Sequence, residues 1–190
     1  MSLDSEPQVE GELVKDQTLI TDKLMQQNLE QKGYGEITKE QFFLKPFESL
    51  YLMYYDKLKL HKAKKIIDFD SLLESCIKYD EDALSKFLIY RDLRTRGYTA
   101  KAGFGFGNDF RVYERGDFGQ KGAKYLVFGL SEGKQEKVGH LQKKIEQITQ
   151  MGKEPIIAVI ERRGEIIYYK ISRMNFHENK DRLYMEKFKF

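Results

Sequence analysis

The spacing of apolar and polar residues predicts a chain of short strands and helices. Near its start, the apolar runs 12–14 and 18–20 flank a short polar run, a pattern that predicts a β-hairpin. Asp22 stands where it can cap the helix that follows, and Gly33 stands where that helix should end. Ordered structure is therefore expected directly after a polar tail at residues 1–8.

Apolar residues of the next segment recur at helical spacing. Phe47, Leu50, Tyr51 and Tyr54 lie three or four residues apart, which predicts an amphipathic helix whose aromatic side belongs to the core. The other expected features are a turn at 38–40, a short strand at 58–60, a basic loop and a helix at 70–79. Together these elements predict an N-terminal α+β unit.

A second unit begins after the acidic run Asp80-Glu81-Asp82. Its expected elements are a helix at 83–96, strands at 101–113 and 125–130, a helix at 137–150, and strands at 155–160 and 166–171. The last two strands are β-branched and are joined by Arg162-Arg163-Gly164, a hairpin signal. The sequence therefore predicts an α+β protein with a small N-terminal α/β domain at 9–80, followed by a C-terminal domain at 81–190 whose mixed sheet is flanked by helices.

The composition narrows the class of protein. A hydrophobic content of 41% and only three prolines argue against disorder. The single cysteine, Cys76, excludes an internal disulfide framework and a cysteine-based zinc site. No apolar run follows a basic start or is long enough to span a bilayer, so we expect a cytoplasmic protein with no membrane partner. The net charge of +3 permits a polyanionic partner without requiring one.

Neither histidines nor carboxylates form a convincing metal site. His61, His140 and His177 lie far apart and lack partners at ligand spacing. Asp109 followed by Glu132-x-Lys134 imitates the core of metal-dependent nucleases, whose carboxylates converge on a divalent cation. Because Glu132 and the lysine fall in a polar loop, a solvated turn is the better interpretation, and no metal is expected.

The most distinctive stretch is Tyr90 to Tyr113, YRDLRTRGYTAKAGFGFGNDFRVY. It begins as a charged helix end, breaks at Gly97 and continues as a strand in which glycines alternate with aromatics. These glycines miss the GxGxxG spacing of a phosphate loop, so we interpret them as places of close packing or a β-bulge. The strand ends in a polar loop at 114–121, which predicts the edge of a site.

Several segments resemble the archaeal tRNA-splicing (tRNA-intron) endonuclease family. They are YRDLRTRGYTAKAGFGFGNDFRVYERG, AKYLVFGL and GKEPIIAVIERRGEIIYYKISR, with weaker similarity in GELVKDQTLITD, KGYGE and FESLYLMYYDKLKL. The resemblance covers nearly the whole chain and implies a nuclease-like C-terminal domain. It also implies that precursor tRNA is cut at bulge–helix–bulge junctions without a metal or cofactor, leaving a 2′,3′-cyclic phosphate and a 5′-hydroxyl.

That reaction needs a base for the 2′-hydroxyl, an acid for the leaving 5′-oxygen and a cation for the phosphorane. The family supplies them with a tyrosine, a histidine and a lysine. The resemblance places Tyr113 on the tyrosine and Lys153 on the lysine, but it places Gly122 on the histidine. Two family arginines that grip a bulge base fall on Glu146 and Ile167, neither of which can take that role.

These departures predict a structural, non-catalytic subunit that supports a catalytic partner in a dimer or a heterotetramer. In the family, subunits associate through C-terminal strands, here 166–171, and through an acidic turn that enters a basic groove. The corresponding turn here, 161–165, is acidic at its ends and basic at its centre. We therefore expect association through the strand edge more than through this turn.

Two alternatives remain open. The first is an active endonuclease subunit, in which Lys121 serves as the acid or from which the histidine was removed by engineering. The second is a plain RNA-binding scaffold with no endonuclease partner. Cationic side chains cluster near the predicted site and are candidates for RNA contact: Arg111, Arg115, Lys121 and Lys124. Contact with phosphate through these residues would be salt-dependent and blind to sequence.

Overall fold

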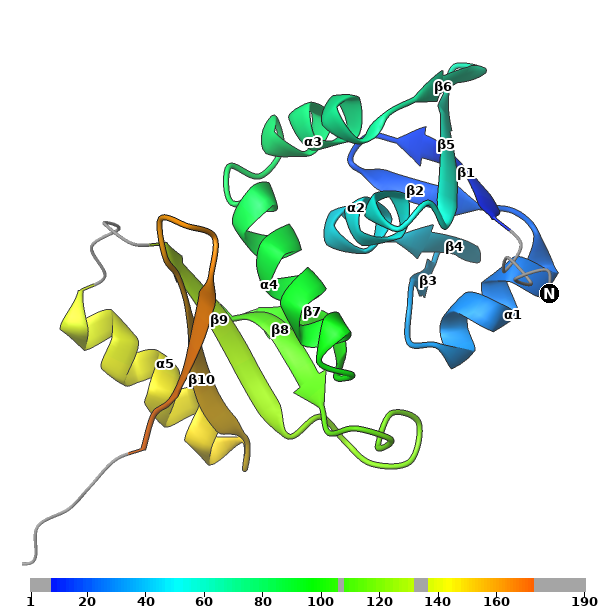
Figure 1. Cartoon of the computed structure of the whole chain (residues 1–190). Helices are drawn as coiled ribbons and strands as arrows, with labels where there is room; N and C mark the ends of the chain where they lie inside the picture. The colour runs from blue at the N-terminus through cyan, green and yellow to red at the C-terminus, as the bar shows by residue number, and fades with distance from the viewer. Residues whose placement is uncertain (1–7, 106–107, 132–136, 173–190) are drawn as a thin grey trace, which may run out of the picture.

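The computed structural model describes residues 8–105, 108–131 and 137–172. The first half contains β1 (Val9–Val14), β2 (Gln17–Ile20), α1 (Lys23–Gln31), β3 (Glu36–Thr38), β4 (Gln41–Leu44), α2 (Pro46–Tyr54), β5 (Leu58–Lys62), β6 (Lys65–Ile67) and α3 (Phe69–Ile77). The second half contains α4 (Ala83–Thr95), β7 (Thr99–Gly105), β8 (Asn108–Tyr113), β9 (Tyr125–Ser131), α5 (Val138–Gln150), β10 (Glu154–Ile160) and β11 (Ile166–Lys170). The strands form two mixed sheets, which confirms the predicted α+β class (Figure 1).

The first sheet has the strand order β3-β4-β2-β1-β5-β6. Its predicted opening hairpin is confirmed as β1 and β2, and the Asp22 carboxylate caps α1 by accepting a hydrogen bond from the Met25 amide (3.0 Å). Gly33 lies just beyond that helix at φ +78°, as the sequence predicted. The expected basic loop after β5 is partly wrong, because its second half forms β6 after a turn at Ala63 and Lys64, both at positive φ.

The second sheet has the strand order β11-β10-β9-β8-β7, with β9 and β10 parallel and joined by α5. The single strand predicted at 101–113 is wrong. The chain doubles back there as the antiparallel pair β7 and β8, since Gly105 adopts φ +92°. The ladder also shifts register between Ala102 and Gly105, which is the kind of irregularity that the glycines were expected to allow. This reversal places Tyr113 opposite Thr99, at the start of β7.

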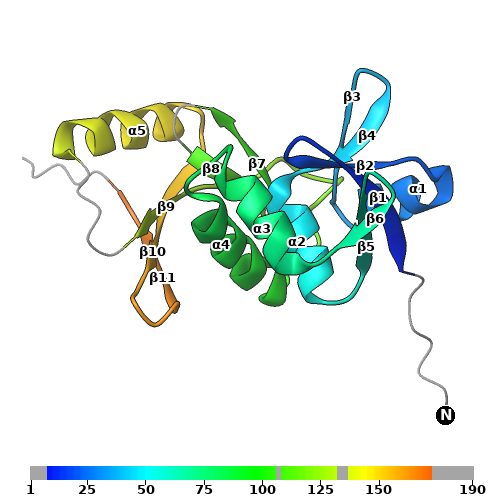
Figure 2. The same ribbon diagram turned by 90° about the horizontal axis from the view of Figure 1, so that it is seen from above.

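Helices α2 and α4 lie between the two sheets in both views (Figures 1 and 2). Their aromatic side chains and those of β8 meet in one apolar cluster. The ring of Phe47 lies 4.8 Å from that of Tyr90 and 5.0 Å from that of Phe110, measured between centroids. The sheets fall on either side of the predicted domain boundary at 80/81, but their core is continuous, so the division stays a prediction.

A buried ion pair also joins the two halves. The Lys101 ammonium of β7 lies 3.7 Å from the Glu48 carboxylate of α2 and donates a hydrogen bond to the Gly35 carbonyl. The same carboxylate accepts hydrogen bonds from the amides of Gly35 (3.1 Å) and Lys45 (2.8 Å). Both charged side chains are almost fully buried, so the pair fixes the first half against the second sheet.

Candidate active site at the end of β8

Tyr113 is the last residue of β8 and stands at the edge of a polar loop. Its ring is half-buried and meets the Phe118 ring edge to face, with centroids 5.1 Å apart. Beyond it, the Lys124 amide donates to the Val112 carbonyl (3.0 Å) and continues the β8–β9 pairing. Gly122, two residues before Lys124, therefore lies past the end of β8, at the same end of the sheet as Tyr113.

Lys153 lies at the same end of the sheet, between the end of α5 and the start of β10. Helix α5 finishes with Gly152 at φ +67°, and the Lys153 amide donates back to the Ile148 carbonyl (3.1 Å). This is the usual glycine-dependent way of ending a helix. The next amide, that of Glu154, donates to the Lys124 carbonyl (3.0 Å), which ties the start of β10 to the loop before β9.

The structure brings positions 122 and 153 together. A Cβ atom built on Gly122 would lie 3.4 Å from the Lys153 Nζ atom, and no other atom of the described residues beyond its chain neighbours lies within 4 Å of it. Among the described residues, a Cβ atom at position 122 would therefore meet only the end of a flexible lysine side chain, which can move aside. The described site thus places a cation beside a position that has no proton donor of its own.

An ionic group that the sequence did not suggest lies next to Tyr113. The Glu114 carboxylate accepts hydrogen bonds from the Tyr125 hydroxyl (2.5 Å) and the Lys124 ammonium (2.7 Å). The bond from Lys124, followed by that from Tyr125, lowers the pKa of Glu114, and the same carboxylate raises the pKa of Lys124. Only the pairing of β8 with β9 brings these residues together, and that register was not predicted.

The four candidate RNA-binding cations all have partners within the chain. They are Arg111 (3.3 Å from a Glu36 carboxylate oxygen), Arg115 (5.2 Å above the Tyr98 ring), Lys121 (2.9 Å from Asp117) and Lys124 (bound to Glu114). Arg111 also lies over the Phe104 ring and contacts the first sheet, whereas the other three surround the loop after β8. RNA phosphate would have to compete with these partners, and the role of the four stays a prediction.

The two positions on which the resemblance places family arginines carry no positive charge. Glu146 lies on α5, where its carboxylate accepts a hydrogen bond from the Gln142 amide (3.1 Å). Ile167 lies on β11, the edge strand, with 38% of its surface exposed. Neither side chain offers a positive plane on which a base could stack.

Among the described residues, no group of three or more histidine, cysteine, aspartate or glutamate side chains is arranged to hold a metal ion. Cys76 is buried, and burial raises the pKa of its thiol to about 11. Glu132, Lys134 and His177 lie outside the described residues. Within the described part of the chain, no helix is both long and apolar enough to cross a membrane.

Comparison with known proteins identifies the family. The descriptions "tRNA intron endonuclease, N-terminal domain" and "tRNA intron endonuclease, catalytic C-terminal domain" match residues 9–73 and 83–168. A tRNA-splicing endonuclease of Methanococcus vannielii is 32% identical over 164 residues, which cover 86% of this chain and 93% of that protein. A tRNA-splicing endonuclease of Thermococcus onnurineus is 30% identical over 155 residues, which cover 82% of this chain and 90% of that protein. One of Pyrococcus horikoshii is 28% identical over 155 residues, which cover 82% of this chain and 89% of that protein.

The two matches follow each other along the chain in the order of its two sheets. The fold agrees with the resemblance seen in the sequence, and the assignment of Tyr113 to the family tyrosine stays a prediction. The chain belongs to the tRNA intron endonuclease family.

Proposed function

We propose that this chain is the structural subunit of a heteromeric tRNA-splicing endonuclease, in which a partner of the same family cuts precursor tRNA. The main support is position 122, where glycine leaves the cation of Lys153 without a neighbouring acid at that position. Loss of a general acid typically lowers a rate by about 10²–10⁴-fold. A tyrosine base could then take the 2′-hydroxyl proton as the 2′-oxygen attacks phosphorus, and a lysine cation could stabilise the phosphorane, but no group would protonate the leaving 5′-oxygen as its bond to phosphorus breaks.

Other features of the site favour the same role. Lys121, the alternative acid, is exposed and paired with Asp117 (2.9 Å), so its ammonium is directed to that carboxylate. Glu146 and Ile167 stand where two arginines would be expected to hold a bulge base, and neither can form that cation–π contact. Tyr113 and Lys153 have structural contacts that do not need catalysis, because the tyrosine packs on Phe118 and the lysine amide closes the end of α5.

The edge of the second sheet suits association with a partner. Strand β11 pairs only with β10 among the described strands, and it exposes Tyr169 as well as Ile167. An unpaired strand edge with apolar side chains is a typical surface for strand addition. The turn before it has exposed arginines at 162 and 163, so it would not complement a basic groove. Association through β11 in a heterodimer or heterotetramer is therefore the arrangement we favour.

The test is cleavage of a bulge–helix–bulge RNA at constant protein concentration. The chain alone should not cut above background, whereas the chain with a family member that bears tyrosine, histidine and lysine should. In that mixture, Tyr113→Phe in this chain should leave the rate unchanged, since the partner performs the chemistry. Cleavage by the chain alone at the rate of the mixture would overturn the proposal.

A gain-of-function variant tests the chemical reason. Gly122→His places an imidazole next to the Lys153 ammonium and should raise cleavage by the isolated chain above background, by up to about 10²-fold. The control is Gly122→Ala, which adds the Cβ atom at this position without a proton donor. Equal rates for the two variants would show that the missing acid does not limit this chain.

A further inference from the structure

A cavity in the first half of the molecule has no part in the site described above. It lies between α1, the end of α2 and the start of β1, and its volume is about 240 Å³. Its lining residues are Val9, Met25, Asn28, Leu29, Lys32, Tyr34, Leu52 and Lys57. The chain is held firmly there, because the Val9 amide donates to the Lys57 carbonyl (2.9 Å) and the Lys57 amide donates to the Leu52 carbonyl (2.7 Å).

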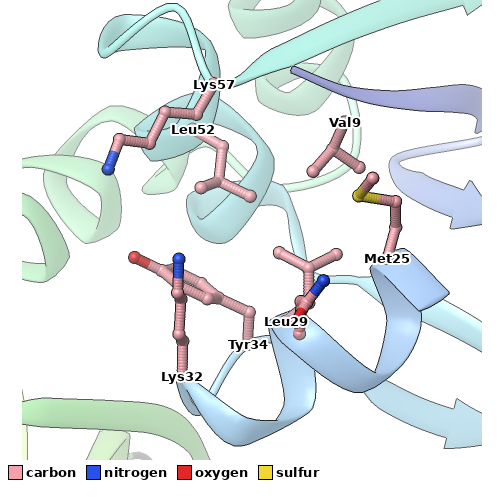
Figure 3. A pocket seen from close by; sticks show the side chains of 8 residues that line it. Val9, Met25, Leu29, Lys32, Tyr34, Leu52 and Lys57 are labelled. Carbon is pink, nitrogen blue, oxygen red and sulfur yellow. The ribbon is translucent and has the colours of Figure 1, made fainter. Parts of the chain in front are cut away.

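The lining is divided into a polar and an apolar side. Figure 3 shows the amino groups of Lys32 and Lys57 and the hydroxyl of Tyr34 on one side of the cavity, and the side chains of Val9 and Met25 on the other. None of the eight lining side chains carries a carboxylate. A ligand that fits this division has an apolar body and an anionic group at one end.

The wall behind Tyr34 adds a third positive charge. The Arg94 guanidinium lies 4.2 Å from the centroid of the Tyr34 ring and donates a hydrogen bond to the Lys32 carbonyl (2.9 Å). Burial raises the pKa of Tyr34, so its hydroxyl stays protonated near neutral pH and remains a hydrogen-bond donor. Two ammonium groups and a hydroxyl thus line one end of the cavity, and the Arg94 guanidinium contacts two of these lining residues, Tyr34 and Lys32.

We propose that this cavity binds one nucleotide, with its base against the apolar side and its phosphate at Lys32 and Lys57. The volume suits a single base, since a cavity of about 150 Å³ accepts a benzene-sized ring and sites for larger organic ligands begin near 300 Å³. Asn28 offers a donor and an acceptor, which is what the edge of a base requires. The source is an unpaired nucleotide of RNA, as expected in an RNA-processing family, or a free mononucleotide with the same chemistry.

The inference goes beyond the proposed subunit role and does not depend on it, because it concerns binding by this chain without a partner. The test measures fluorescence anisotropy of a short fluorescein-labelled single-stranded RNA with the full chain at low salt. Competition with unlabelled adenosine 5′-monophosphate and with an abasic RNA of the same length separates base recognition from phosphate recognition. The chain should bind the intact RNA more tightly than the abasic RNA.

Three variants locate the site. Lys57→Glu and Lys32→Glu should each weaken binding by about tenfold or more, as expected for a lost charge-assisted contact. Lys23→Glu is the matched control, because Lys23 is exposed, begins the same helix α1 and does not line the cavity. Asn28→Trp, at an exposed helix position, should block the cavity without altering the core, and circular dichroism verifies that each variant is folded.

The outcomes are distinct. Selective loss in the three cavity variants supports the site, and efficient competition by the mononucleotide then assigns it to a free nucleotide instead of RNA. Equal weakening by Lys23→Glu and Lys57→Glu would mean only general attraction to a basic surface and would overturn the site. Equal binding of abasic and intact RNA would overturn it too, since the apolar side would then have no ligand.

Discussion

The buried pair of Glu48 and Lys101 allows a quantitative test of how the two halves are joined. At an effective dielectric constant of about 20, unit charges 3.7 Å apart attract by about 4.5 kcal/mol. Lys101→Met removes that attraction and leaves a carboxylate whose residue is only 1% exposed. Loss of one partner from a buried pair typically costs about 3–5 kcal/mol, and we expect a loss of stability in this range.

Urea unfolding at neutral pH, followed by circular dichroism, measures the effect. The control is Glu48→Gln combined with Lys101→Met, which removes both charges while the side-chain oxygen of the introduced glutamine can still accept a hydrogen bond from the Gly35 or Lys45 amide. The double variant should be more stable than Lys101→Met alone, because no uncompensated charge stays buried. A cost below about 1 kcal/mol for Lys101→Met would refute the role given to this pair.

The pH dependence of the stability of Lys101→Met follows from the direction in which the pKa of Glu48 is shifted. Burial raises the pKa of Glu48, and the Lys101 charge opposes that rise. The native carboxyl thus binds a proton more readily than the unfolded one, and the stability that it contributes is lost as the pH rises through the folded pKa. Lys101→Met should raise this pKa further, so the difference in stability from the wild type should shrink as the pH falls below neutral.

Three other changes give results that simpler measurements can check. Asp22→Ala removes the cap of α1 and should cost about 1 kcal/mol in urea unfolding; no loss would mean that the bond to the Met25 amide adds nothing. Phe110→Ala should cost about 3–5 kcal/mol, because this side chain is fully buried where the two halves meet; a cost typical of a surface site would contradict a shared core. Cys76 should react with iodoacetamide only as the protein unfolds, since burial raises the pKa of its thiol to about 11; rapid labelling of the native protein would contradict this burial.

Local signals in the sequence predicted most helices and strands because each depends on neighbours along the chain. The cap at Asp22 and the glycine after α1 are examples, and both act within a few residues. The prediction failed at 101–113. Glycines and aromatics alternate there across the turn between β7 and β8, so the two strands looked like one in the sequence. Its length was the missed signal, since strands usually have about 3–10 residues and this one would have had more.

Contacts between distant segments could not be predicted in the same way. Glu114 meets Lys124 and Tyr125 only through the register of β8 and β9, and Glu48 meets Lys101 only after the two halves pack. A lysine at position 101 in a strand gives no hint that it is 5% exposed. Burial of a charge is decided by what covers it, which single-sequence patterns do not contain.

The three positions of the expected triad differ in how much they reveal about function. Tyr113 packs on Phe118, and the backbone of Lys153 ends α5, so either residue has a structural reason to be present without catalysis. Position 122 is exposed, and among the described residues a Cβ built there meets only the Lys153 ammonium, so a histidine at this position would add nothing to the core. An imidazole there would have no packing role to explain it, so under the proposed function the glycine at 122 is a stronger indication than the two residues that the resemblance places on the tyrosine and the lysine.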